Sequence, residues 1–263
     1  MAGRLEGKVA LITGGGAGGI GGAAAVLFAR EGAKVVIAEL KRDTGEASEA
    51  AVRAAGGEAL FVPTDVTSED SVREAVRQGV ARFGALHVLF NSAGGSIPAD
   101  SLVTDVDLAA VWNHTMNLDL LGTIHACRHA IPEIIKAGGG SVVNMSSGAA
   151  LRGASPSHIY TAAKGAILSL TRAMAGAYAH QRVRVNAICA GRIHSQRILS
   201  TFGTPENPGP VFDRQDPAGR VKEYPFWVGQ PEDIANIALF LASEESRMIT
   251  GAAIPAEGGR SAY

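Results

Sequence analysis

The chain has 263 residues, of which 46% are hydrophobic and 19% are charged, and its formal net charge is −1. This composition is typical of a soluble globular protein, excludes a largely disordered chain, and lacks the basic excess of a nucleic-acid-binding protein. Chains of this length in the α/β class are commonly one unit with one large core, so we expect a single domain over residues 1–263.

Targeting and metal-binding patterns are absent from the sequence. The apolar run Val9–Thr13 ends in glycines and is too short for a signal-peptide core or a membrane span. Cys127 and Cys189 lie in apolar surroundings without CxxC or Cys/His spacing, which favours buried thiols over a disulfide or a zinc site. His125 and His129 share a helix face but lack an acidic third ligand. We therefore expect a cytoplasmic protein with no metal, no membrane partner and no nucleic-acid partner.

Short apolar segments rich in β-branched residues alternate with longer, alanine-rich amphipathic segments. Strands that are apolar on both faces are expected where helices cover both faces of a sheet. The alternation predicts βαβ units and an α/β fold with a doubly wound parallel sheet. The expected strands are 9–13, 34–39, 59–65, 86–94, 141–147, 183–191 and 251–259. The expected helices are 22–30, 44–55, 68–83, 107–136, 155–179 and 231–242.

A glycine cluster, "TGGGAGGIGGAAA" from Thr13 to Ala25, lies between the first expected strand and the first expected helix. Glycines let the backbone turn sharply and approach a pyrophosphate, which the free N–H groups of the helix start then bind. This position near the N-terminus predicts a dinucleotide site. The cluster has no Gly-Lys-Ser/Thr ending, which excludes a P-loop.

Glu39 ends the second expected strand. A carboxylate at this place accepts hydrogen bonds from the adenosine ribose hydroxyls and repels a 2′-phosphate. Lys41 and Arg42 follow closely and would suit that phosphate, but the glycine cluster contains no basic residue. We therefore expect NAD rather than NADP. The alternative for Glu39 is an ordinary solvated charge at a strand end.

Tyr160 and Lys164 are four residues apart in "HIYTAAKG", so they share one face of the expected helix. Positive charge near a phenol favours its anion, and such a tyrosine exchanges a proton with an alcohol or carbonyl oxygen at neutral pH. The spacing is common by chance. Whether Tyr160 and Lys164 form a reactive centre therefore depends on the motifs around them.

Several motifs occur together in an order that resembles the short-chain dehydrogenase/reductase family, from "GKVALITGG" to "GAAIPAEGG". After the glycine cluster they are Asp65-Val66, "NSAG" at 91–94, Asn117 in "MNLDLLG", "VVNMSS" at 142–147, "YTAAK" at 160–164 and "NAICAG" at 186–191. The resemblance implies a Rossmann fold and an enzyme that transfers a hydride between a nicotinamide cofactor and a secondary alcohol or ketone.

The resemblance also implies a catalytic set. Tyr160 would be the general acid/base, and Lys164 would hold the nicotinamide ribose and favour the phenolate. Ser147, which stands thirteen positions before the tyrosine, would hydrogen-bond the substrate oxygen in preference to Ser146. Asn117 would anchor a water that links Lys164 to solvent. The implied cofactor-binding set, which includes Glu39, is Gly14, Gly16, Gly19, Ile20, Glu39, Leu40, Asp65, Val66, Asn91, Ala93, Gly94, Tyr160, Lys164, Ile193 and Ser195.

Two departures from the family pattern stand out. The glycine cluster is one residue longer than usual, so either Gly18 or Gly19 takes the phosphate-facing place. We favour Gly19 because Ile20 and Gly21 follow it in the usual way. Ala190 replaces the usual proline and removes a fixed φ angle from the segment that follows.

Residues 192–229 contain five prolines, scattered aromatic residues and little periodicity. A long irregular segment inside a compact domain is usually functional, so we expect a substrate lid there. Its apolar groups favour a hydrophobic or cyclic substrate. This segment also contains four arginines, Arg192, Arg197, Arg214 and Arg220. We expect them to be solvated surface charges, and contact with an anionic substrate is the alternative.

Taken together, these features predict an NAD-dependent oxidoreductase that acts on a small-molecule secondary alcohol or ketone. One alternative is an NADP-linked 3-oxoacyl or carbonyl reductase. Another is a non-catalytic, cofactor-sensing Rossmann protein, which would be expected to have lost the catalytic set. The resemblance further implies a homo-oligomer, expected to be a tetramer, with helices 107–136 and 155–179 and the C-terminal strand at its interfaces.

Overall fold

The computed structural model describes residues 3–153, 155–203 and 226–262. Parallel strands form a seven-stranded central sheet in the order β3-β2-β1-β4-β5-β6-β9. This arrangement confirms the predicted α/β Rossmann fold. The strands are β1 (Val9–Thr13), β2 (Lys34–Glu39), β3 (Ala59–Pro63), β4 (Val88–Asn91), β5 (Gly140–Ser147), β6 (Val183–Ala190) and β9 (Ala253–Ala256).

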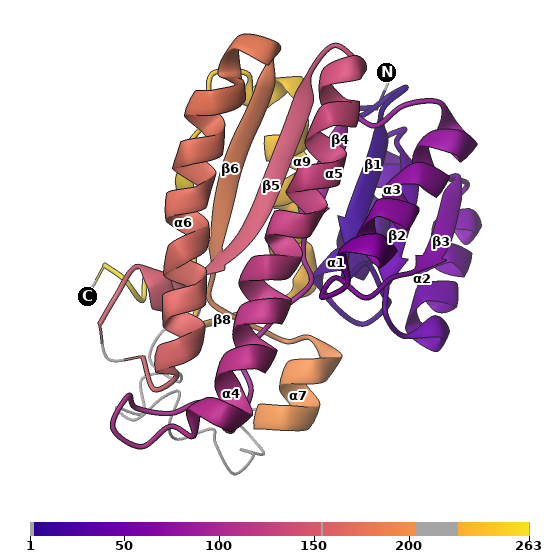
Figure 1. Cartoon of the computed structure of the whole chain (residues 1–263). Coiled ribbons are helices and arrows are strands. Elements are labelled where there is room, and N and C mark those ends of the chain that lie inside the picture. The colour runs from indigo at the N-terminus through magenta and orange to yellow at the C-terminus, as the bar shows by residue number, and fades with distance from the viewer. Residues whose placement is uncertain (1–2, 154, 204–225, 263) are drawn as a thin grey trace.

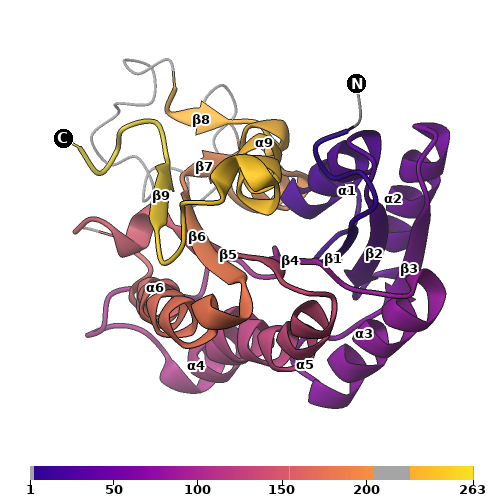
Figure 2. The same ribbon diagram turned by 90° about the horizontal axis from the view of Figure 1, so that it is seen from above.

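Helices cover both faces of the sheet. Figure 2 shows α1, α2 and α9 on one face and α3, α4, α5 and α6 on the other. Along β1, Ala10 and Ile12 join the core under the first layer, whereas Val9 and Leu11 join the core under the second, so every residue of the strand is buried. The helices are α1 (Ile20–Arg30), α2 (Arg42–Ala54), α3 (Glu69–Phe83), α4 (Leu108–Thr115), α5 (Gly122–Lys136), α6 (His158–Tyr178) and α9 (Pro231–Ala242), with short 3₁₀ turns η2 (Gly148–Ala150), η3 (Ala179–Gln181) and η5 (Glu244–Ser246).

The expected helix 107–136 is not one regular α-helix, and the prediction was wrong on this point. A π-helical segment, η1 (Met116–Leu121), separates α4 from α5. A π turn is wider than an α turn and is frequent at functional sites. Gly122 follows it and packs closely on Val66, since a Cβ added to the glycine would lie 2.8 Å from the valine Cγ2.

The segment after β6 crosses the carboxyl ends of the strands. It forms β7 (Arg192–Ile193) and α7 (Gln196–Phe202), and β7 pairs in parallel with β8 (Val228–Gly229). Figure 1 shows α7 and α4 at the same end of the molecule. The expected lid thus includes β7, α7 and β8, while residues 204–225 lie outside the described part of the chain.

Both cysteines are buried and free, which confirms the expectation of buried thiols. Burial raises the pKa of the Cys127 thiol to about 12, so this residue stays protonated at neutral pH. Within the described ranges no helix has the length and hydropathy needed to cross a membrane.

Candidate active site

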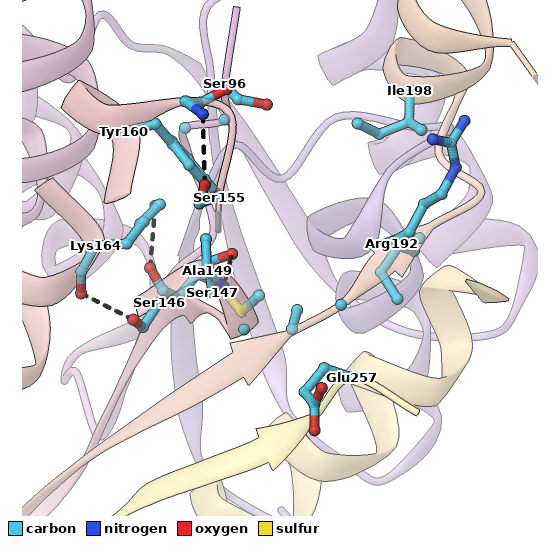
Figure 3. A pocket seen from close by; sticks show the side chains of 18 of the residues that line it. Ser96, Ser146, Ser147, Ala149, Ser155, Tyr160, Lys164, Arg192, Ile198 and Glu257 are labelled. Atoms are coloured by element: carbon cyan, nitrogen blue, oxygen red, sulfur yellow. Dashed lines mark hydrogen bonds between the residues drawn. The ribbon is translucent and has the colours of Figure 1, made fainter. Parts of the chain in front are cut away.

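A pocket lies where the central strands of the sheet end. Since all the strands are parallel, their carboxyl ends meet at one edge, where ligands of this architecture bind. Figure 3 shows Ser147, Tyr160 and Lys164 on one side of the pocket, with Arg192 and Ile198 across it. The residues that line it include Ile20, Ser92, Gly94, Gly95, Ser96, Ser147, Arg152, Ser155, Tyr160, Lys164, Arg192, Ile193, Ser195, Arg197, Ile198, Glu257 and Arg260.

The end of β5 presents two serines with different partners. The Ser146 hydroxyl donates to the backbone oxygen of Lys164 at 2.8 Å and so ties the strand to α6. The Ser147 hydroxyl accepts from the backbone N–H of Ala149 at 3.1 Å. The Ser147 hydroxyl hydrogen is therefore not committed to that bond and is free to be donated into the pocket.

Helix α6 carries Tyr160 and Lys164 on one face, as their spacing predicts. Both residues line the pocket, and the Lys164 Nζ lies 5.6 Å from the centroid of the Tyr160 ring. The lysine is only 3% exposed, and its Nζ donates to the backbone oxygen of Met145 at 3.1 Å. The pair is therefore held in a fixed arrangement at the pocket wall.

Asp100 fixes the start of α6, and the sequence did not indicate this role. Its buried carboxylate accepts from the backbone N–H groups of Ile159 at 3.2 Å and of Tyr160 at 2.7 Å. A carboxylate at a helix N-terminus satisfies free N–H groups and interacts favourably with the helix dipole. Helix α6 begins at His158, three residues after the expected start at Ser155.

Asp100→Ala is expected to lower the free energy of unfolding by about 1–3 kcal/mol, because two N–H groups at the start of α6, one buried and one part-buried, lose their acceptor. Urea unfolding followed by circular dichroism measures this change. Asp100→Asn keeps one acceptor oxygen and should lose less. Equal stability of Asp100→Ala and the wild type would contradict the capping role.

Lys164 has an acidic partner that the sequence prediction did not include. Its Nζ lies 2.8 Å from Oδ1 of Asp119, and both side chains are buried. Burial by itself lowers the pKa of Lys164, but the charges of Asp119 and Tyr160 more than offset it, so this pKa lies above the ordinary lysine value. The lysine is consequently an ammonium ion at neutral pH.

The structure does not bring Asn117 to Lys164, which corrects the expected catalytic set. Asn117 is exposed on η1, two residues before the buried Asp119. The helical periodicity of the segment indicates that Asp119, and not Asn117, faces inward. Asp119 follows the buried residues Val111 and Thr115 at intervals of four. Asp119 therefore faces inward, and residue 117 faces solvent.

The glycine cluster forms a tight turn between β1 and α1. Gly14 has a positive φ of 62°, and a Cβ added to it would lie 2.7 Å from the Ala93 Cα. Gly19 is the N-cap of α1, and a Cβ added there would meet no heavy atom of the described residues within 4 Å. This open N-terminus has the room and the free N–H groups that a dinucleotide pyrophosphate requires.

Glu39 lies beside this turn. Its Oε2 accepts from the Gly16 N–H at 3.2 Å, and its Oε1 accepts from the Lys41 N–H at 3.1 Å. The following residue, Leu40, is 65% exposed. The carboxylate thus stands at the strand edge beside the glycine turn, which is the arrangement expected for ribose recognition.

The remaining expected cofactor residues divide into two groups. Ile20, Gly94, Ile193 and Ser195 line the pocket together with Ser147, Tyr160 and Lys164. Asp65, Val66, Asn91 and Ala93 do not line it. The Asn91 amide donates to the Asn144 Oδ1 at 2.9 Å inside the core, so this side chain helps to hold β4 against β5.

Two of the four arginines expected at the surface line the pocket. Arg192 is buried and donates to the Gly203 backbone oxygen at 2.7 Å, so its assignment as a solvated charge was wrong. Arg197 is exposed, as expected, and also donates to the Ser96 backbone oxygen at 2.9 Å. Arg214 and Arg220 lie outside the described residues.

The helix-face histidines have structural partners. The His125 Nδ1 lies 3.0 Å from the Val66 backbone oxygen, and the His129 Nε2 lies 3.1 Å from the Glu69 Oε1. Among the residues that the structure describes, no cluster of three or more histidine, cysteine or acidic side chains could hold a metal ion.

Comparison with known proteins places this site in a family. The profile of a family described as enoyl-(acyl carrier protein) reductase matches residues 15–261. A 2,5-dichloro-2,5-cyclohexadiene-1,4-diol dehydrogenase of Sphingobium indicum is 39% identical, over 98% of each chain. The chain belongs to the short-chain dehydrogenase/reductase family. As a short-chain dehydrogenase, it is an oxidoreductase that acts on CH–OH groups.

Two further members of the short-chain dehydrogenase family resemble this chain over nearly its full length. A cis-4-hydroxycyclohexanecarboxylate dehydrogenase of Sinomonas cyclohexanicum is 36% identical, over 97% of each chain. The solved structure of a 7α-hydroxysteroid dehydrogenase, in complex with NADH and 7-oxo glycochenodeoxycholic acid, is 30% identical. It superposes with a TM-score of 0.85 over 97% of this chain and 95% of its own.

Proposed function

We propose that this short-chain dehydrogenase transfers a hydride between NAD(H) and a secondary alcohol or ketone, with Tyr160 as the general acid/base. The observation that carries the proposal is that Ser147, Tyr160 and Lys164 line one pocket that also reaches Ile20, at the start of the glycine-turn helix. When bound, the nicotinamide ring supplies or accepts the hydride. The protein supplies the binding, the orientation and the proton.

Each residue of the set has a defined task in this proposal. In the direction of alcohol oxidation, the Tyr160 phenolate removes the hydroxyl proton, and in reduction the phenol returns it to the carbonyl oxygen. The Ser147 hydroxyl donates a hydrogen bond to the same oxygen. The Lys164 ammonium stabilises the phenolate by its charge and holds the nicotinamide ribose. All three groups are positioned before the substrate arrives, so little reorganisation is needed during the reaction.

NAD is the proposed cofactor because of the charge at the end of β2. Glu39→Gln keeps an acceptor for the Gly16 N–H and removes the charge that repels a 2′-phosphate. The variant is expected to bind NADPH about tenfold more tightly than the wild type does. Fluorescence titration with NADH and NADPH measures this. Glu46→Gln, on the exposed surface of α2, is the matched control. Wild-type protein that prefers NADPH would contradict the assignment.

A hydrophobic, ring-bearing substrate is proposed on two grounds. The relatives described above are named for ring-containing substrates. Apolar groups such as Ile193 and Ile198 line the pocket, while Arg152 and Arg197 add positive charge to it. A panel of cyclic secondary alcohols, with and without a carboxylate, should be screened for NADH formation. Absence of turnover across the panel with either cofactor would favour the non-catalytic alternative.

We also propose that the protein is a homotetramer. Large apolar side chains are exposed along one stretch of α4, η1 and α5, namely Leu108, Trp112, Leu121 and Ile124. Exposed apolar patches of this kind commonly mark protein interfaces. Light scattering after size-exclusion chromatography tests the proposal, and a monomer at micromolar concentration would contradict it.

A further inference from the structure

Asp119 and Lys164 form a buried ion pair at the centre of the proposed active site. The Lys164 Nζ lies 2.8 Å from the Asp119 Oδ1, and the side chains are 4% and 0% exposed. A buried ammonium without an anionic partner readily loses its proton, because burial disfavours the charged form. The carboxylate is therefore the group that permits a charged lysine at this depth.

The same carboxylate holds the loop that follows β4. Its Oδ1 also accepts from the Gly95 N–H at 2.9 Å. Gly94 adopts a φ of 136°, which favours glycine, and a side chain there would collide with Asp119. Asp119 thus connects the loop at one side of the pocket with the lysine beneath Tyr160.

In the described part of the chain, the second carboxylate oxygen of Asp119 has no donor of its own, so Lys164 is the main group that stabilises the charge of this carboxylate. The Oδ2 atom is buried and has no hydrogen-bond donor within residues 3–153, 155–203 and 226–262. A buried carboxylate with so few donors depends on its cationic partner for stabilisation. The two charges are consequently coupled, so that removing one of them destabilises the charged form of the other.

We propose that Asp119 is a positioning residue for the oxidoreductase reaction, because it keeps Lys164 charged beneath Tyr160 and so sets the pH range in which Tyr160 exchanges its proton. This inference rests on the proposed function. Asp119 acts through the lysine and does not itself contact the reacting atoms.

Other charged groups lie around the pair and the pocket. Arg197 on α7 opposes the lysine charge, while the Asp100 carboxylate binds the backbone at the start of α6. Arg152, Arg192, Glu257 and Arg260 are the further ionisable residues of the described pocket lining. Among these groups Asp119 is the one with an ion-pair distance to the lysine in the described structure.

Asp119→Asn removes the charge with almost no change in shape. Loss of a nearby negative charge makes deprotonation of the groups around it easier. The pH window of kcat/KM for alcohol oxidation, which requires phenolate and ammonium together, is therefore expected to move to lower pH by about one unit. The matched control is Asp70→Asn, which removes an exposed charge on α3. An unmoved window in Asp119→Asn would overturn the proposal.

A second measurement does not depend on activity. Nuclear magnetic resonance of protein with ¹³C-labelled lysine side chains gives the titration of Lys164, assigned by its disappearance in Lys164→Met. In the wild type the midpoint should lie above the ordinary lysine value of about 10.4. In Asp119→Asn it should fall by at least about one pH unit. A wild-type midpoint below the ordinary value would overturn the proposal even where the variant fails to fold.

The two proposals fail in different ways. If no alcohol is oxidised by the wild type, the proposed function fails, while the lysine titration still tests the ion pair. If the wild type is active and neither the lysine midpoint nor the pH window moves in Asp119→Asn, only the role of Asp119 fails.

Discussion

Tyr160→Phe is expected to lower kcat for NAD-linked alcohol oxidation by about 10²–10⁴-fold, the usual contribution of a general acid/base. Phenylalanine keeps the ring, so the contact with the Lys164 side chain and the packing of α6 are retained. Only the ionisable oxygen is lost. Steady-state kinetics on the best substrate of the panel measures the effect, and NADH titration should show binding within about twofold of the wild type.

The matched control for this substitution is Tyr178→Phe. Tyr178 ends the same helix but packs against the core under α3 and α5, away from the pocket. It should therefore keep wild-type turnover. Unchanged turnover in Tyr160→Phe would refute a proton-transfer role, and loss of NADH binding together with turnover would indicate a structural defect instead.

The sheet could be predicted from the sequence because local and global preferences agree there. Each expected strand is a short apolar run, and its burial on both faces follows from the helices between the runs. Since parallel strands end at one edge, placing Ser147 and the glycine turn at strand ends was sufficient to bring them to the same side of the sheet. The spacing of Tyr160 and Lys164 then fixed their common face.

The polar partners of the pocket residues could not be predicted in the same way. Asp100 caps α6 from a loop nearly sixty residues earlier, and no local pattern records that contact. The motif resemblance points to Asn117, whereas helix periodicity directs Asp119 toward the core. Arginines usually lie at the surface, yet the Arg192 guanidinium donates to a backbone oxygen in the fold. Long-range polar contacts decide these three cases.

Gly21→Ala is expected to lower the free energy of unfolding by about 1–3 kcal/mol, the usual cost of overpacking. Helix propensity predicts the opposite sign, because alanine is a better helix former than glycine. The structure decides between them, since a Cβ on Gly21 would lie only 2.1 Å from the Gly14 backbone oxygen. Gly14 cannot retreat freely because it is itself packed against Ala93. Urea unfolding of the variant therefore tests whether the turn is as close as described.

Gly19→Ala separates cofactor binding from folding in the same turn. Within the part of the chain that the structure describes, a methyl group at this N-cap meets no atom within 4 Å, so the loss of stability should stay below about 1 kcal/mol. The methyl would instead stand at the open N-terminus of α1, where the pyrophosphate is proposed to bind, and NADH affinity should fall at least about tenfold. Gly18→Ala is the comparison, because its φ of 82° makes any side chain strained there. If Gly19→Ala binds NADH as tightly as the wild type does, the prediction for Gly19 is wrong and Gly18 is the residue that faces the phosphate.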